Sequence, residues 1–346
     1  MLRHIIKTRM HVVHCIHSTE CGNCPNLPLS QKEKEEQKRS WLAQLLQFPD
    51  LEFISSPKQE NYRARISLRP DKFGQLGYFK PKSHTHVQIS ACTIAHQNIN
   101  QALQNLPKLT FPVKAIEFRS NGKDLLLNIL SQKGRRPKKE LLQDWLSDEI
   151  QGIGIDSHPL VGQKKLEFEV CGVTHQISLG SFYQVNLEIN ELLVQTILDW
   201  VLEQEPQKVL DLYCGAGNIG CAIANKGVPV IGIESSTSSV QDCQKTIQRH
   251  QLDMEIRKGD ADKFQAGDAY FDLAILDPPR KGAGEVFKEL RFTNPKAIIY
   301  VSCNPYALQK DLREAKKWGY QPARMVAFDM FPHTSHVETL VELRKI

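Results

Sequence analysis

The chain lacks any hydrophobic run long enough to cross a membrane. No stretch of its 346 residues approaches the ~20 apolar residues that a membrane helix needs. The first ten residues lack the apolar core of a signal peptide, and internal repeats and long low-complexity segments are absent. We therefore expect a cytoplasmic protein, monomeric and without a membrane partner, rather than a repeat or membrane-embedded one.

A disulfide-scaffold pattern is also missing. The nine cysteines are an odd number without regular spacing, and no export signal accompanies them. Such cysteines suggest metal binding or catalysis rather than structural disulfides. The composition, 41% hydrophobic and 24% charged, is that of an ordinary globular protein, and the length suggests two or three domains.

Basic residues are concentrated in the front half of the chain. Residues 1–180 hold 25 lysines and arginines against 17 aspartates and glutamates, whereas residues 181–346 hold 19 against 22. This asymmetry predicts polyanion binding by the front half. The densest basic run, residues 133–139, is explained equally well as a solvated loop.

The hydrophobic pattern divides the chain into three parts. In residues 1–50 a cysteine-rich stretch is followed by a helix, for which Ser30 and Glu33 form a capping box. Residues 51–185 carry short alternating runs, such as 62–69, 113–119 and 166–170, typical of strands. From residue 186 to 346 strands alternate with helices, beginning with a long amphipathic helix at 187–202. This pattern predicts a doubly wound α/β domain at the carboxyl end.

A glycine-rich turn joins the first strand of that domain to a helix. Gly215, Gly217 and Gly220, in the run 211–220, have the G-x-G-x-x-G spacing that allows a ligand to approach the backbone closely. Glu234 ends the next strand, where it can accept hydrogen bonds from ribose hydroxyls. The pattern predicts a nucleoside-cofactor site and fits NAD as well as S-adenosylmethionine.

A later strand ends in Asp277-Pro-Pro-Arg280, which favours S-adenosylmethionine. Two prolines make the loop rigid at the carboxyl edge of the sheet, and the dehydrogenase fingerprint contains no such feature. Loops of this type resemble those of methyltransferases that act on nucleic-acid bases. A simple strand-terminating turn would explain one proline but not the set.

Cys303 ends another apolar strand, directly before Pro305 and a predicted helix. The carboxyl edge of an open α/β sheet is where such proteins keep their sites. A helix amino terminus at this point would favour the thiolate form of the cysteine. Taken alone, however, a buried cysteine is more often an inert packing residue.

Four motifs, read in order, resemble those of the RNA uracil-C5 methyltransferases, the RumA/RumB/TrmA-like family. They are Asp-Leu-Tyr-Cys-Gly-Ala-Gly-Asn at 211–218, Asp-Pro-Pro-Arg at 277–280, Val-Ser-Cys-Asn-Pro at 301–305 and Asp-Met-Phe-Pro-His-Thr-Ser-His-Val-Glu at 329–338. Ser-Phe-Tyr-Gln-Val-Asn at 181–186 is similar to a further family motif. The resemblance implies a Rossmann-like S-adenosylmethionine methyltransferase domain, preceded by a β-rich RNA-contacting domain and a small cysteine cluster segment.

The resemblance also implies roles for individual residues. Cys303 matches the nucleophile that adds to uracil C6, and Glu338 matches the general base that removes the C5 proton. Without its flanking motif, Glu338 would read as a surface glutamate on a final strand at 337–343. Positions matching the family's cofactor-binding residues are Gln184, Tyr213, Glu234 and Asp277, with Asn218 and Asp260 as weaker candidates.

Cys15, Cys21 and Cys24 form a tight group near the amino terminus. Three thiols at this spacing fit zinc or an iron–sulfur cluster comparably well. The family resemblance supplies Cys92 as the fourth ligand and favours a [4Fe–4S] cluster. A zinc site with one histidine remains the alternative, and its candidate ligands are His14, His17 and His96.

Only 14 residues precede Cys15, whereas RumA-like enzymes carry an RNA-binding barrel before the cysteines. This difference favours the shorter RumB-like (RlmC) type and a uridine of 23S rRNA as substrate. A uridine in tRNA or elsewhere in rRNA is the alternative within the class. An RNA-binding protein with a vestigial methyltransferase domain is the alternative from another class.

Overall fold

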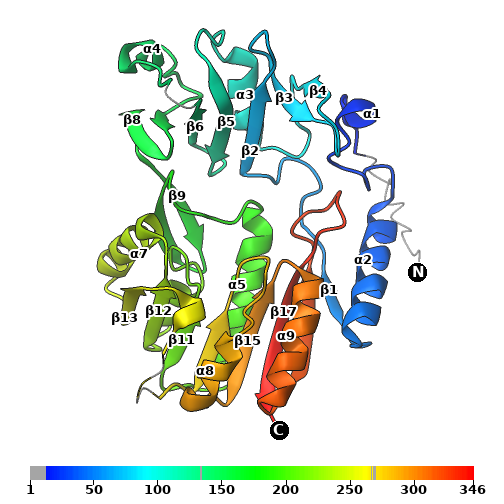
Figure 1. The fold of residues 1–346 in the computed structure, drawn as a ribbon, viewed down its shortest axis with the longest axis vertical. Coiled ribbons are helices and arrows are strands. Elements are labelled where there is room, and N and C mark those ends of the chain that lie inside the picture. The colour runs from blue at the N-terminus through cyan, green and yellow to red at the C-terminus, as the bar shows by residue number, and fades with distance from the viewer. Residues whose placement is uncertain (1–12, 133–134, 266, 268–269) are drawn as a thin grey trace, which may run out of the picture.

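The computed structural model describes residues 13–132, 135–265, 267 and 270–346, and it has two lobes (Figure 1). The first ten residues, on which the signal-peptide argument rests, and the first two residues of the basic run 133–139 lie outside the described part. In the described part no helix combines the length and the apolar character that a membrane crossing requires.

The larger lobe is built on an eight-stranded sheet in the order β1-β16-β17-β15-β14-β11-β12-β13. Apart from β17, which is antiparallel to both β15 and β16, neighbouring strands run parallel. The bounds are β1 Glu52–Ile54, β11 Val209–Leu212, β12 Val230–Glu234, β13 Met254–Lys258, β14 Leu273–Leu276, β15 Ala297–Ser302, β16 Tyr320–Phe328 and β17 Glu338–Lys345. The predicted α/β fold of this lobe is confirmed.

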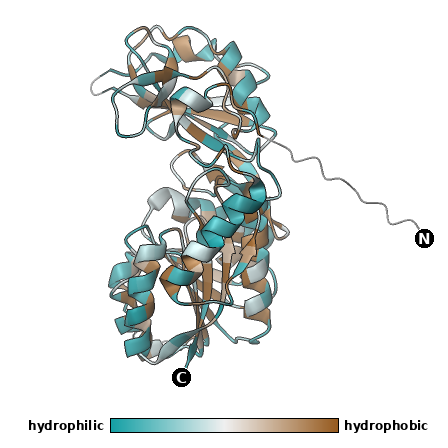
Figure 2. Cartoon of the chain, turned by 90° about the vertical axis from the view of Figure 1, so that its right-hand side faces the viewer, coloured by the Kyte–Doolittle hydropathy of each residue, from teal (hydrophilic) through white to brown (hydrophobic). Residues whose placement is uncertain are grey.

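Helices cover both faces of this sheet, so its central strands are buried on both sides and read as apolar runs. One face packs against α5 and α6, and the other against α2, α8 and α9. The bounds are α2 Gln31–Leu46, α5 Leu187–Leu202, α6 Gly220–Ala224, α7 Thr237–His250, α8 Val286–Thr293 and α9 Pro305–Lys317, with a 3-10 turn η1 at Ala261–Lys263. In Figure 2 the hydrophobic colour gathers along the strands, between helices that are largely hydrophilic.

The smaller lobe is a seven-stranded sheet in the order β4-β3-β2-β5-β6-β7-β8. Along β2 the side chains alternate: Ile66 and Leu68 lie in the core, whereas Arg65 and Ser67 are turned away from it. The bounds are β2 Arg65–Pro70, β3 Leu76–Phe79, β4 His86–Gln88, β5 Val113–Ser120, β6 Leu125–Ser131, β7 Gly152–Ile155 and β8 His158–Gly162, with helices α3 Gln97–Asn105 and α4 Lys139–Gln143.

A two-stranded hairpin, β9 Lys165–Val170 and β10 Val173–Ser178, lies between the lobes and packs on α7. Buried Asp242 of α7 fastens it: the carboxylate accepts hydrogen bonds from the Ser178 backbone and hydroxyl and from the Ser181 hydroxyl, and it pairs with Lys165. These bonds also hold the start of the 181–186 motif against the larger lobe.

The amino-terminal segment joins the larger lobe. After the short helix α1, Ser18–Cys21, the capping box of α2 is present as predicted: Ser30 accepts from the Glu33 backbone, and Glu33 accepts from the Ser30 backbone. β1 then pairs with β16. The boundary predicted at residue 51 assigned these residues to the central part, whereas their backbone hydrogen bonds belong to the carboxyl-terminal sheet.

Two glycines of the turn after β11 offer a stability test. Both have left-handed backbones, with φ +56° at Gly215 and +85° at Gly217. A Cβ on Gly217 would lie 2.5 Å from the Cys221 sulfur, whereas one on Gly215 would meet nothing within 4 Å. Either substitution by alanine costs about 1–2 kcal/mol of unfolding free energy through the backbone. We expect Gly217→Ala to cost about 1–3 kcal/mol more through overpacking.

The measurement is chemical unfolding of both variants, followed by circular dichroism in the absence of ligands. Equal midpoints for Gly215→Ala and Gly217→Ala would contradict the packing argument.

Candidate active site

A cavity of about 960 Å³ opens where the carboxyl ends of the central strands of the larger lobe face the smaller lobe. Its walls come from the glycine-rich turn, the Asp277 loop, the end of β15, the start of β17 and the 180–185 segment. The structure brings together here every residue predicted for catalysis or cofactor binding: Gln184, Tyr213, Asn218, Glu234, Asp260, Asp277, Cys303 and Glu338.

Glu234 is held at the rim by backbone donors. The Gly215 amide donates to one carboxylate oxygen at 3.0 Å, and the Ser236 amide donates to the other at 2.6 Å. The oxygen bound by Ser236 also accepts from the Ser235 hydroxyl at 3.3 Å, whereas the oxygen bound by Gly215 retains a second lone pair that can accept a hydrogen bond from a ligand hydroxyl. Because nothing lies within 4 Å of a Cβ position on Gly215, the turn leaves open space beside this carboxylate.

Asn218 and Asp260, the weaker candidates for cofactor binding, already form hydrogen bonds with neighbouring residues. Asn218 exchanges two hydrogen bonds with Asn190 of α5, at 2.8 and 3.0 Å. Asp260 accepts from the Asp262 backbone and so caps η1. The Tyr213 hydroxyl donates to Asp262 at 2.6 Å, and this contact, after burial, raises the pKa of Tyr213. Asp262 was not predicted, although it stands two positions after Asp260.

The loop after Asp277 is held by hydrogen bonds to helix α9. Asp311, buried in α9, accepts hydrogen bonds from the Ala283 amide at 2.7 Å, the Gly284 amide at 3.2 Å and the Tyr300 hydroxyl at 2.5 Å. Burial raises the pKa of Asp277 itself to about 7. The predicted rigid loop is therefore held by a buried carboxylate as well as by its prolines.

Cys303 and Glu338 are neighbours because of strand register. β15 and β17 are antiparallel with Ser302 opposite Thr339, so the next positions outward bring Cys303 and Glu338 opposite each other. Glu338 is 4% exposed, whereas Cys303 is half-buried and faces the cavity. A thiol and a carboxyl group thus line the same cavity.

The electrostatics of this pair differ from the sequence-based expectation. Burial, then the charges of Glu338 and Asp277, raise the pKa of Cys303 to about 11, while Arg280 acts in the opposite direction. Burial and Asp277 likewise raise the pKa of Glu338 well above its usual value, again opposed by Arg280. The helix terminus was expected to favour the thiolate, but burial beside two carboxyl groups outweighs it.

Aromatic and basic side chains complete the cavity and were not predicted as site residues. Arg63 stacks over Phe331 with 5.7 Å to the ring centroid, and Arg65 over Phe182 at 5.3 Å. His336 packs edge-on to Phe331. Phe182, Phe331 and His336 lie within the family-like motifs at 181–186 and 329–338, so the sequence carried a signal for them, whereas Arg63 and Arg65 belong to the ordinary alternating run 62–69.

The four predicted metal-ligand cysteines approach one another from two segments. Burial, and then the neighbouring Cys92, Cys21 and Cys15 thiols, raise the pKa of Cys24 to about 12. All nine cysteines of the chain are free thiols. Nevertheless, among the described residues no three or more cysteine, histidine, aspartate or glutamate side chains are arranged to hold a metal ion.

The three histidines considered as zinc ligands are His14, His17 and His96, and two of their rings contact other groups. His17 accepts a hydrogen bond from the Ser90 amide at 3.2 Å, and the His96 ring contacts the Ser120 hydroxyl at 3.1 Å. The His14 backbone carbonyl accepts a hydrogen bond from Thr93. Two of the three candidate imidazoles therefore have partners other than the thiols.

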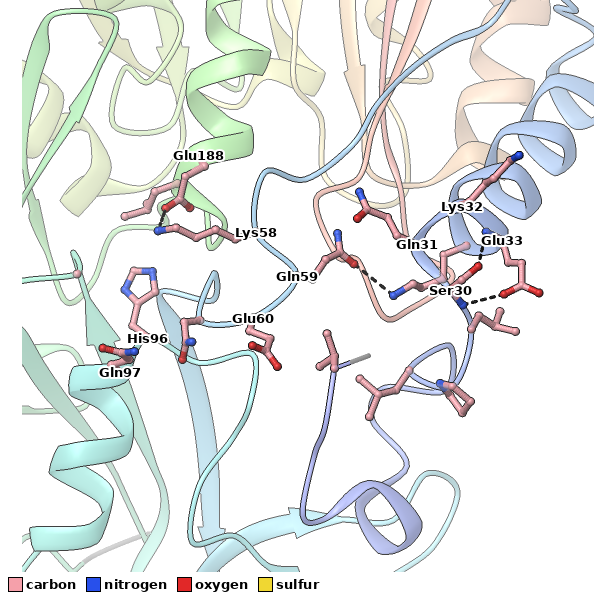
Figure 3. A pocket seen from close by; sticks show the side chains of 18 of the residues that line it. Ser30, Gln31, Lys32, Glu33, Lys58, Gln59, Glu60, His96, Gln97 and Glu188 are labelled. Carbon is pink, nitrogen blue, oxygen red and sulfur yellow. Dashed lines mark hydrogen bonds and ion pairs between the residues drawn. The ribbon is translucent and has the colours of Figure 1, made fainter. Parts of the chain in front are cut away.

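A second cavity, of about 1,620 Å³, lies between the start of α2, the 58–61 segment, the start of α3 and the start of α5. Figure 3 shows Lys58 paired with Glu188 across it and the Ser30–Glu33 capping box at its edge. Both acidic and basic side chains line this cavity, so its lining favours neither an anionic nor a cationic ligand.

Known proteins similar to this chain are RNA methyltransferases. The chain is 28% identical over 341 residues to a 23S rRNA (uracil(1939)-C(5))-methyltransferase RlmD of Aeromonas hydrophila, covering 90% of this chain and 77% of that protein. It is 30% identical over 334 residues to an uncharacterized RNA methyltransferase of Bdellovibrio bacteriovorus, covering 91% and 75%. RlmD is the RumA-like type, whereas the short stretch before Cys15 favoured the RumB-like type.

A solved structure shares the fold. The Pyrococcus abyssi tRNA (uracil-54, C5)-methyltransferase, in complex with S-adenosyl-L-homocysteine, superposes with a TM-score of 0.79 at 24% identity, over 93% of this chain and 86% of that one. The family model described as tRNA (Uracil-5-)-methyltransferase matches residues 162–346, which is more than half of the chain. The chain therefore belongs to this family of S-adenosylmethionine-dependent RNA uracil-C5 methyltransferases.

Proposed function

We propose that the protein methylates C5 of a uridine in 23S rRNA, through a covalent bond between Cys303 and C6 of the base. The observation that carries the proposal is the placement of Cys303 opposite Glu338 in a cavity that also contains the glycine-rich turn. Relatives similar along 90% of the chain are named for 23S rRNA uracil-C5 methylation, which favours rRNA as the substrate.

A uridine of tRNA is the second candidate. The description of the family and the name of the Pyrococcus abyssi enzyme both refer to tRNA. The two candidates share the chemistry and differ in the RNA that the basic front half binds.

The bound cofactor would lie along the turn after β11. S-adenosylmethionine supplies an electrophilic methyl group. Glu234 would accept a hydrogen bond from a ribose hydroxyl, Tyr213 and Gln184 would border the cofactor, and Asp277 would lie beside the reacting groups. Asn218 and Asp260 would contribute through the shape of the wall, since their side chains already have local partners.

The proposed reaction assigns a role to Cys303 and to Glu338. The Cys303 thiolate adds to C6, and the electron pair of the C5–C6 double bond moves towards the C4 carbonyl, which makes C5 nucleophilic. C5 would then take the methyl group from S-adenosylmethionine, whose methyl–sulfur bond breaks and whose remainder leaves as the thioether. The Glu338 carboxylate then accepts the C5 proton, the double bond re-forms and the bond from C6 to sulfur breaks. The base must leave its stack to reach the cavity.

We further propose that Cys15, Cys21, Cys24 and Cys92 hold a [4Fe–4S] cluster, with zinc as the alternative. A donor set made of four thiols suits iron–sulfur chemistry. After burial, the other three thiols raise the pKa of Cys24, as expected of neighbouring groups. The side chains as described do not form a ligand set. The cluster would fasten the amino-terminal segment to the smaller lobe.

Substituting the proposed nucleophile tests the covalent route. We expect Cys303→Ala to lower the rate of 5-methyluridine formation by about 1,000-fold or more, because the enolate can no longer form. Calorimetry should show unchanged S-adenosylmethionine affinity. Cys171→Ala, which removes another partly buried free thiol, is the matched control and should retain activity.

The same assay with 23S rRNA and tRNA, each unmodified, separates the two substrates. Methylation of tRNA alone would overturn the rRNA assignment. A Cys303→Ala protein that still methylates uridine would overturn the mechanism, and a wild-type protein that binds RNA without methylating it would indicate the vestigial alternative.

The pH dependence follows from the shifted pKa values. The thiolate of Cys303 and the carboxylate of Glu338 are both deprotonated forms, and both pKa values are raised. We therefore expect kcat/KM to rise with pH from neutral pH towards the pKa of Cys303, about 11. Arg280→Met removes the cation that lowers both pKa values, so the rise should move to higher pH, whereas Lys310→Met on exposed α9 should leave it in place.

A rate that is flat or falling over this range in the wild-type protein would contradict the assignment of these two groups.

The proposed cluster predicts a colour. Anaerobically purified protein should show a broad absorption at about 400 nm that bleaches with dithionite. Cys24→Ser should lose most of this absorption, whereas Cys171→Ser should keep it. A colourless protein with stoichiometric zinc would refute the iron–sulfur assignment in favour of the alternative.

A further inference from the structure

Helix α2 carries two buried lysines, one helical turn apart, on the face turned towards the 329–337 segment. Lys34 is 4% exposed and Lys38 is 3% exposed. Lysines are almost never buried to this extent unless they are paired. Both make their contacts with the segment that connects β16 to β17 and ends at Glu338.

Lys38 binds the beginning of that segment twice. Its ammonium donates to the Asp329 carboxylate at 2.6 Å and to the Phe331 backbone carbonyl at 3.0 Å. The Asp329 side chain is 2% exposed, so the ion pair is shielded from water. The Asp329 amide also donates to the Ile54 carbonyl of β1 at 2.9 Å. The start of the segment is thus held by both α2 and β1.

Lys34 binds the middle of the segment through His333. One ring nitrogen of His333, Nε2, lies 2.6 Å from the Gln59 carbonyl, so it must carry the proton and donate. Burial lowers the pKa of His333 to about 4 and keeps the ring neutral. Nδ1 is then an acceptor, which matches the Lys34 ammonium 3.2 Å away. Lys34 also donates to the Gln59 side chain at 3.3 Å.

The segment held in this way forms part of the cavity wall. Phe331, whose carbonyl Lys38 binds, presents its ring to Arg63 and His336, and all three side chains line the cavity. Glu338 begins the strand that follows. A buried ion pair contributes little net stability, because removing both charges from water offsets their attraction. The position of this ion pair instead favours a role in holding the 329–337 segment in place.

We propose that Lys38, supported by Lys34, is a positioning residue for Glu338: it holds residues 329–337 against α2 so that the carboxyl group faces Cys303. This inference rests on the proposed role of Glu338 as the base. It also gives the amino-terminal segment a function in the reaction, since α2 directly follows the cysteine-rich stretch.

The test uses Lys38→Met, which removes the charge and keeps most of the side-chain volume. A displaced base slows removal of the C5 proton after the methyl group has been transferred. We therefore expect turnover to fall about 10- to 100-fold, while the covalent complex between protein and methylated RNA accumulates on denaturing gels, as with Glu338→Gln. S-adenosylmethionine affinity should be unchanged. Lys32→Met, at an exposed position of the same helix, should behave as wild type.

A second variant guards against a loss of folding. In Lys38→Met/Asp329→Asn neither charge is left unpaired, so the thermal midpoint should return towards that of the wild type while the covalent complex still accumulates. Normal turnover of either variant would overturn the proposal. So would a parallel loss of covalent complex and turnover in the double variant, which indicates a purely structural role. Normal turnover of Glu338→Gln would instead overturn the role of the base.

Discussion

The antiparallel insertion of β17 between β15 and β16 is the constraint on which the site depends. In a sheet whose other neighbours are parallel, this strand alone runs the opposite way, so its first residue lies at the edge where the others end. Glu338 therefore stands opposite Cys303, although 35 positions separate them in the sequence. The register of the β15–β17 pair brings nucleophile and base to the same edge of the sheet, and the 329–337 segment, tied to α2, leads into the strand that carries Glu338.

The electrostatics of the cavity follow from the same packing. Two carboxyl groups and a thiol share a buried space in which Arg280 is the cation that acts on both Cys303 and Glu338. Burial raises the pKa values of Asp277, Glu338 and Cys303; the charge of Asp277 adds to the rise for Glu338, and the charges of Glu338 and Asp277 add to the rise for Cys303. This environment keeps the thiol protonated in the free protein. A bound RNA and cofactor would change both the exposure and the charge of the space.

Local features were predictable because they depend on residues close in sequence. The Ser30–Glu33 capping box, the helix Leu187–Leu202 and the turn after β11 have the structures that their patterns predict. The motifs also indicated residues that converge on one cavity. The pairing of β1 with β16 could not be predicted, because a three-residue strand carries no pattern that names its distant partner. The burial of Lys34 and Lys38 could not be predicted either, because lysines are rarely buried unless paired and the partners of these two are distant in the sequence.

The sequence by itself determined the fold class, the family and the residue types of the site, since the order of the motifs and the hydrophobic period can be read without knowing any contact. The tertiary structure decided what surrounds those residues. A helix start favours the thiolate, but burial, and then the carboxyl groups brought by β17 and the Asp277 loop, raise the pKa of Cys303 instead. The ties from α2 to Asp329 and His333 likewise join residues nearly 300 positions apart. Such effects depend on distances across the fold, which residue order alone does not contain.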